Sequence, residues 1–174
     1  MTTGRLIHPA ESHLPIFPRL VVTHLREAGY SELEIFADLG FSNQDLEREA
    51  FRLDAAQHEK FIQRAIHLTD NLHLALEMKD HAFDATSNAV LMLFATSGRI
   101  SKALQLITRF NPIYTRTVAS KLEDSPEGPL LSVVSHIKDE LVAYFALSSF
   151  ALFIDNFFKQ ALNGEHLVTR ARMA

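Results

Sequence analysis

Along most of the chain, apolar residues recur at every third or fourth position, the spacing that places side chains on one face of an α-helix. This pattern predicts helices over residues 19–28, 55–69, 88–96, 100–110 and 140–162, with short helices after residues 31 and 42 and over 71–79. Within 71–79 the apolar residues alternate with polar ones, so a strand is an alternative for that segment.

Small polar residues mark where several of these helices begin. Ser31 and Glu34 have the spacing of a capping box, in which the side chains and backbone amides of the first turn satisfy one another. Ser42 with Asp45 repeats this spacing, and Asp54 is the candidate cap of the helix over 55–69. The predicted helix ends are Gly29, Gly40 and the dipeptide Asn111-Pro112.

The pattern changes near residue 114. Tyr114 to Leu122 is rich in Thr and Val and partly alternating, and Leu130 to Ile137 is apolar and β-branched. Glu123 to Pro129, which contains two prolines and a glycine, separates them as a turn, so we expect one β-hairpin. The predicted fold is therefore α+β and mostly helical, with about seven to eight helices, a small β-hairpin and a long Phe-rich helix near the C-terminus.

A chain of 174 residues has the length of one domain. We expect residues 1–14 to be a loose N-terminal lead-in and residues 15–174 to form a single domain. Leu167 to Met173 has the pattern of a strand that the chain does not complete, so the domain is expected to be truncated at its C-terminal end.

Composition and charge exclude several functions. The formal net charge is −4, whereas a broad nucleic-acid-binding face needs a basic excess. Residues 34–46 have the helix, turn glycine and capped second helix of a helix-turn-helix, but residues 31–49 hold six acidic side chains and one basic one, so we interpret the pair as a packing motif. The chain has no cysteine, which excludes disulfides, thiolate metal sites and thiol catalysis.

The remaining chemistry-bearing residues form no recognisable motif. The chain has nine histidines, and no two are four residues apart, so the spacing that joins two imidazoles on one helical face is missing. The six glycines are too dispersed for a phosphate-binding loop, and G-x-S-x-G is absent. We therefore expect no metal, no cofactor and no enzymatic activity. An enzyme would need Ser, His and Asp residues brought together by the fold.

The most apolar stretch, Leu141 to Ile154, is shorter than the ~20 apolar residues of a membrane-spanning helix. It stops at Asp155-Asn156, and the start of the chain lacks the apolar core and cleavage site of a secretion signal. We expect a core helix in a soluble cytoplasmic protein.

The predicted helix over 140–162 allows two interpretations. Small and polar residues share one narrow face: Ser148, Ser149, Leu152, Asp155, Asn156 and Lys159. Phenylalanines cover much of the remainder. The helix is either a core helix with one solvated stripe, or it lines a pocket or a subunit interface. If it lines a pocket, the candidate residues are Phe145, Phe150, Phe153 and Phe157, with Tyr114 or His136 binding a polar head.

A series of motifs follows in order along the chain. They are Ala28-Gly29, Leu39-Gly40-Phe41, Arg52-Leu53, His67-Leu68-Thr69-Asp70-Asn71, Leu74-Ala75-Leu76, and then Leu91 to Ser97, Ile100, Ala103-Leu104 and Ile107 to Tyr114. In this order they resemble the arabinose-binding-type N-terminal domain of AraC-type transcription regulators, over about Leu20 to Met173. Two segments depart from the family's pattern: Asp70-Asn71 replaces Gly-Asp-Pro, and Ser97-Gly98-Arg99 replaces Ser-Pro-Thr.

The resemblance implies a domain that senses an effector, dimerises, or both, in a bacterial regulator. Proteins of this family are about twice as long, and their C-terminal half carries two helix-turn-helix units that bind DNA. Nothing in this chain matches those units, so DNA binding is expected only through a missing C-terminal half. The partners implied are a small-molecule effector and a second copy in a homodimer.

The composition favours an apolar or amphipathic effector over a sugar. Sugar sites favour Trp or Tyr platforms, and this chain has no Trp and three Tyr but 13 Phe. The alternative is a ligand-free helical protein–protein interaction module.

Overall fold

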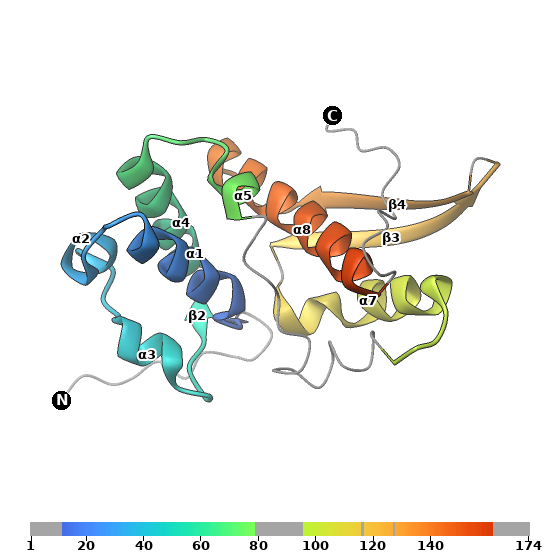
Figure 1. Cartoon of the computed structure of the whole chain (residues 1–174), viewed down its shortest axis with the longest axis horizontal. Coiled ribbons are helices and arrows are strands. Elements are labelled where there is room, and N and C mark those ends of the chain that lie inside the picture. Colours follow the sequence, from blue (N-terminus) through green and yellow to red (C-terminus); the bar gives the residue numbers. More distant parts are fainter. Residues whose placement is uncertain (1–11, 79–95, 116, 127, 162–174) are drawn as a thin grey trace.

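The computed structural model describes residues 12–78, 96–115, 117–126 and 128–161 (Figure 1). Within these ranges the chain forms seven helices and two small antiparallel sheets, so the predicted α+β, mostly helical class is confirmed. The helices are α1 (Ile16–Glu27), α2 (Glu32–Phe36), α3 (Asn43–Glu47), α4 (Ala55–Thr69), α5 (Leu74–Glu77), α7 (Ile100–Tyr114) and α8 (Glu140–Ala161). The strands are β1 (Ser12–His13), β2 (Leu53–Asp54), β3 (Val118–Ser125) and β4 (Gly128–Ser135).

The predicted helix caps are confirmed. At α2 the Ser31 amide donates to Glu34 Oε2 at 2.8 Å, and the Glu34 amide donates to Ser31 Oγ at 3.3 Å. Ser42 begins α3 with the same reciprocal bonds. Asp54 accepts the Gln57 amide at 2.7 Å and begins α4 at the predicted residue. These helix starts are set by side chains within one turn, and for that reason the local pattern predicts them.

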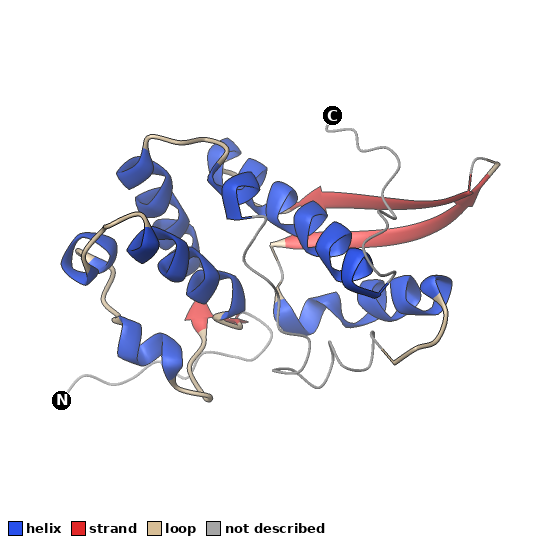
Figure 2. Ribbon diagram, viewed as in Figure 1, coloured by secondary structure: helices blue, strands red, loops and turns tan. Residues whose placement is uncertain are grey.

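The first hydrophobic cluster lies among α1 to α5 and the beginning of α8, the left half of the view in Figure 2. The aromatic rings of Phe36, Phe41 and Phe61 contact one another there, with centroids 5.8 to 6.4 Å apart. From α8, Val142 and Phe145 complete the cluster.

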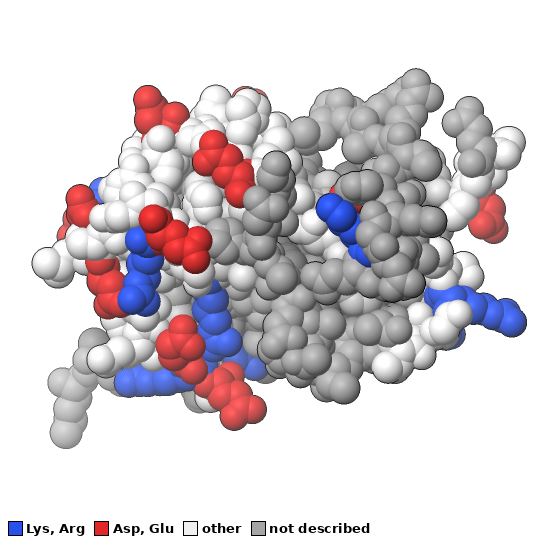
Figure 3. All heavy atoms as spheres, in the orientation of Figure 1, with Lys and Arg blue, Asp and Glu red and all other residues white. Residues whose placement is uncertain are grey.

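The acidic pair α2 and α3 belongs to this cluster. Ile35 and Leu46 are fully buried beneath the two helices. Arg64 of α4 donates to the Glu34 carbonyl at 2.9 and 2.8 Å, and Arg19 of α1 donates through Nε to the Leu46 carbonyl at 2.7 Å. The helix-turn-helix-like segment is therefore a packing motif, as its charge predicted. On the face shown in Figure 3, acidic and basic side chains of the described residues intermingle over this half.

The second hydrophobic cluster lies among α7, the hairpin and the C-terminal part of α8 (Figure 1). Strands β3 and β4 pair from Val118↔Ser135 to Ser125↔Gly128. Helix α8 packs against α4, α5 and β4 and contributes residues to both clusters, so it is the element that joins the two halves.

Helix α7 does not end at Asn111-Pro112 as predicted but continues to Tyr114. Pro112 lies in the last turn, where it removes one backbone hydrogen bond, and the Thr115 amide still reaches the Asn111 carbonyl at 3.1 Å. Asn111 Nδ2 also donates to the Val118 carbonyl at 2.9 Å, which fixes the helix end to β3.

The hairpin turn is shorter than the predicted segment from Glu123 to Pro129. Both strands extend to Ser125 and Gly128 because the outer face of the hairpin is open, and Glu123 and Asp124 can stay exposed while their backbones pair.

Part of the expected loose N-terminal lead-in is ordered. Ser12 and His13 fall within the expected loose lead-in, but they pair with Asp54 and Leu53, and His13 is buried. A strand so short has no sequence signature, because its register is set by contacts with α4 and β2.

Within the segment 71–79, for which the pattern allowed a helix or a strand, the structure has a helix. This helix is shorter than predicted and is α5.

The predicted helix over 88–96 and the strand over 167–173 fall outside the described residues, except for Thr96, which lies in a turn. Among the described helices, one is long and apolar enough to cross a membrane, at Glu140–Lys159 in α8, and half of that window is buried inside the protein. Its contacts with both hydrophobic clusters are those of a core helix.

Candidate functional site

Three of the four predicted pocket phenylalanines lie side by side on α8. The Phe153 ring stands 6.4 Å from Phe150 and 6.0 Å from Phe157, between centroids, and meets Phe17 of α1 edge-on at 6.4 Å. Phe157 contacts Phe158 at 5.3 Å. We call Phe150, Phe153, Phe157 and Phe158 the aromatic row. All four are buried in the second cluster, where aromatic pairs add to the stabilisation from burial.

Phe145, the fourth predicted residue, lies elsewhere. Its side chain belongs to the first cluster, with Val142 and residues of α4 and α5. Because Phe145 precedes Phe150 by more than one helical turn, it lies on the part of α8 that enters the other half of the molecule. The structure therefore does not bring all four phenylalanines together.

The two candidates for a polar head have different surroundings. His136 follows β4, its side chain is exposed, and its backbone amide donates to the Thr117 carbonyl at 2.8 Å. Tyr114 is the last residue of α7, and its side chain lies outside the described part of the structure.

The polar face predicted for α8 is not a solvated stripe along its whole length. Ser148 and Ser149 are 2% and 5% exposed, and among the described residues neither hydroxyl has a hydrogen-bond partner. Ser120 of β3 has a buried hydroxyl of the same kind. Only Lys159, at the end of the face, is exposed, because α8 is enclosed by α4, α5 and β4.

Sequence reasoning missed a buried histidine pair. The rings of His13 in β1 and His58 in α4 stack with centroids 4.8 Å apart and an angle of 26° between planes. His13 Nδ1 lies 3.3 Å from Thr115 Oγ1, which in turn lies 2.6 Å from Thr117 Oγ1. Burial lowers the pKa of His58 to about 3, and burial also lowers the pKa of His13 against the opposing effect of Asp54. A contact between residues so distant in sequence leaves no spacing signal.

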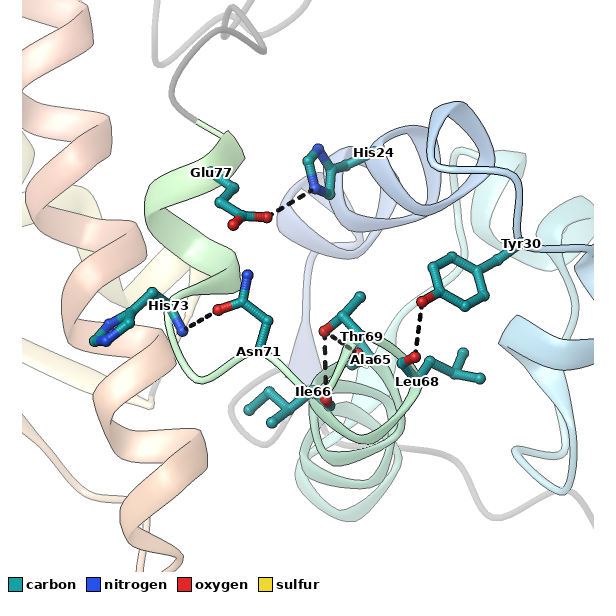
Figure 4. A network of polar contacts seen from close by, with 9 residues as sticks. All are labelled: His24, Tyr30, Ala65, Ile66, Leu68, Thr69, Asn71, His73 and Glu77. Atoms are coloured by element: carbon teal, nitrogen blue, oxygen red, sulfur yellow. Dashed lines mark hydrogen bonds and ion pairs between the residues drawn. The ribbon is translucent and has the colours of Figure 1, made fainter.

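A network of polar contacts holds α1, α4 and α5 together (Figure 4). The Tyr30 hydroxyl donates to the Leu68 carbonyl at 2.8 Å, and His24 Nε2 approaches Glu77 Oε2 at 3.9 Å. Asn71 Oδ1 accepts the His73 amide at 2.8 Å, and the His73 ring contacts the Tyr144 hydroxyl of α8 at 2.8 Å. Most of these bonds end on backbone groups or turn residues, so the network fixes the packing of helices.

A depression of about 520 Å³ lies at the start of α7. It is lined by Ser97, Gly98, Arg99, Ser101, Lys102 and Gln105, most of which are exposed. Among the described residues, no three His, Asp or Glu side chains are grouped so that they could hold a metal ion. These surfaces offer no enclosed arrangement of reactive groups.

The described residues thus form a mostly helical α+β arrangement in which an aromatic helix packs in both hydrophobic clusters. The chain matches the family of the N-terminal arabinose-binding domain of AraC transcription regulators over residues 29–172, and it belongs to that family. It is thus an effector-binding N-terminal domain from transcription regulation, and its family is not one of enzymes. No curated protein matches the chain.

Proposed function

We propose that this domain is the sensing part of a cytoplasmic bacterial AraC-type regulator and that it binds a small apolar or amphipathic molecule at the aromatic row of α8. The observation that carries the proposal is that α8 combines adjoining Phe rings with buried serine hydroxyls for which the described residues supply no hydrogen-bond partner. Apolar walls with a few convergent polar groups are typical of sites for such ligands.

The buried hydroxyls support a ligand with a polar end. A hydroxyl removed from water without a hydrogen bond costs free energy, so Ser148 and Ser149 favour a state in which an incoming group bonds to them. A carboxylate or hydroxyl head would accept or donate such bonds, while an alkyl tail would contact Phe153 and Phe157. Tyr114 and His136 remain proposed additional contacts to the head.

Helix α8 provides a route from the ligand to the rest of the domain. Its C-terminal part holds the aromatic row, and its N-terminal part holds Val142 and Phe145 in the first cluster. A molecule inserted beside Phe153 would displace α8 relative to α1 to α5. An effector acts by binding one such arrangement more tightly than the other.

Isothermal titration with decanoate, a straight-chain fatty acid, and with L-arabinose tests the proposal. We expect decanoate to bind and arabinose not to bind. Phe153→Leu is expected to weaken decanoate binding about tenfold or more, because it removes ring contacts at the centre of the row. The matched control is Phe41→Leu, since Phe41 is 7% exposed and Phe153 is 8% exposed, but Phe41 lies in the first cluster.

Tight binding of arabinose without binding of decanoate would contradict the apolar-effector proposal. Equal loss of affinity in both variants would show that the effect comes from general destabilisation. Native mass spectrometry of the protein as purified extends the test to ligands other than decanoate, because a retained molecule is identified by its mass.

Homodimer formation is a separate part of the proposal. Leu130 and Val134 of β4 are more than half exposed, and they alternate with the half-buried Leu131 and Val133 that face the second cluster. An exposed apolar strand face favours association of two copies. Sedimentation velocity of the wild type and of Val134→Glu measures it, and a monomer at all concentrations would refute dimerisation. An oligomer that binds no small molecule would favour the interaction-module alternative.

A further inference from the structure

The stacked histidines lie where three segments that are distant in sequence meet. His13 comes from β1 and His58 from α4, both beside the first cluster, while Thr115 belongs to the connection between α7 and β3 in the second half. Figure 1 shows the α7–β3 junction next to the short sheet of β2. The pair is therefore a second connection between the two halves, besides α8.

The surroundings of the pair accommodate neutral imidazoles. His13 is 3% exposed and His58 8% exposed, and His58 Nδ1 has no hydrogen-bond partner among the described residues. The Asp54 carboxylate of β2 raises the pKa of His13 against the effect of burial, and among the described residues of the α7–β3 side the Thr115 hydroxyl contacts His13 and the Thr117 hydroxyl contacts Thr115. Two imidazolium ions stacked at 4.8 Å would repel one another in this site, and one imidazolium would lack solvation.

The geometry is unsuited to a shared metal ion. A metal binds an imidazole nitrogen in the plane of the ring, and rings only 26° from parallel direct their lone pairs alongside one another and not to a common point. A role in holding segments together accounts for the same contacts.

We propose that the His13–His58 pair is a proton-sensitive latch that holds β1 and the α7–β3 connection together while both imidazoles are neutral and releases them when the imidazoles take up protons. This inference is independent of the proposed effector. Released imidazoles enter water and regain the ordinary histidine pKa of 6.5, so acid stabilises the open arrangement. Between pH 7.5 and 5.0 the population of the open form rises by about 30-fold from the release of His58, whose pKa is about 3 in the closed form, and His13, whose pKa is also lowered, adds to this rise.

Hydrogen–deuterium exchange of the full chain at pH 7.5 and 5.0 tests the latch, after correction for the intrinsic pH dependence of amide exchange. We expect the amides of residues 12–14 and of Thr115, Thr117 and Val118 to exchange at least about 30-fold faster at pH 5.0. Amides in the middle of α4 serve as the internal reference and should keep their protection. Equal exchange at both pH values, or an equal increase throughout α4, would overturn the latch.

Variants separate the two imidazoles. His58→Phe keeps an aromatic ring in the stack and should reduce the acid effect to that of His13, and the double variant His13→Phe/His58→Phe should abolish it. His136→Gln is the matched control, because His136 is exposed, and it should retain the wild-type response. Persistence of the response in the double variant contradicts the proposal.

If the double variant does not fold, NMR titration of the imidazole resonances of the wild-type protein tests the latch instead. The imidazole of His58 is expected not to titrate between pH 8.0 and 5.5 in the closed protein, and the midpoint of His13 is expected to lie below 6.5. Midpoints near 6.5 for both His13 and His58 would show that the pair is solvated, and the latch would be ruled out.

Discussion

Protonation of His58 should make the stability of the whole domain depend on pH between 7 and 5. Its pKa is about 3 in the folded protein because burial disfavours the charged imidazole, and 6.5 in the unfolded chain. Below pH 6.5 the unfolded state therefore binds a proton that the folded state does not, so stability falls as pH falls. The slope is about 1.4 kcal/mol per pH unit, which gives a loss of about 2 kcal/mol between pH 7 and pH 5 from His58 alone.

Urea unfolding followed by circular dichroism, at pH 7.0, 6.0 and 5.0, measures this loss. The range is chosen because it lies above the ordinary carboxyl pKa values. Glu34, Asp45 and Asp139 have a lowered pKa in the folded protein, so their own acid destabilisation sets in as the pH falls toward the ordinary values and lies mostly below this window. His13, whose pKa is also lowered, adds to the loss in the same direction.

His58→Phe is the perturbation that isolates the effect. The variant should lose about 2 kcal/mol less than the wild type between pH 7 and pH 5, whatever its stability at pH 7. His136→Gln should follow the wild type. If the wild type and His58→Phe show the same pH dependence, then His58 is protonated in the folded state, and the reasoning from burial fails.

Three further predictions concern stability. Ser148→Ala should be neutral or stabilising by up to about 1 kcal/mol in urea unfolding, because it removes a buried hydroxyl that has no partner among the described residues; a loss above 1 kcal/mol would imply a hydrogen bond. Arg64→Met should cost about 1–2 kcal/mol by leaving the Glu34 carbonyl without its charged donors, and a change in thermal midpoint within error of the wild type would refute this role. Pro112→Ala should stabilise the domain by about 1 kcal/mol by supplying an amide for the Thr108 carbonyl, and an unchanged or lower urea midpoint would contradict it.

The arrangement of the aromatic row was partly accessible from the sequence. The helical period places Phe150, Phe153 and Phe157 on one face of α8, whereas Phe145 falls on the face of Ser148 and Ser149, and the structure has Phe145 in a different cluster from Phe153. The period does not show which neighbouring element covers each side of a helix. For that reason the sequence leaves open whether Ser148 and Ser149 are solvated or enclosed, and the structure buries both.

The sequence by itself determined the features that arise within one or two helical turns. Ser31, Ser42 and Asp54 begin helices because their side chains bond to amides three residues later, and α8 is predicted because its apolar residues recur at helical spacing. Family membership also followed from the order of short motifs along the chain.

Tertiary structure decided everything that depends on elements meeting at a distance. The continuation of α7 through Pro112, the pairing of β1 with β2 and the stack of His13 on His58 each rest on a partner more than a turn away. The free energy of burial and of long-range hydrogen bonds is comparable to the local preferences of single residues. The fold can therefore override a proline, order a two-residue strand and keep two histidines neutral, none of which the local pattern records.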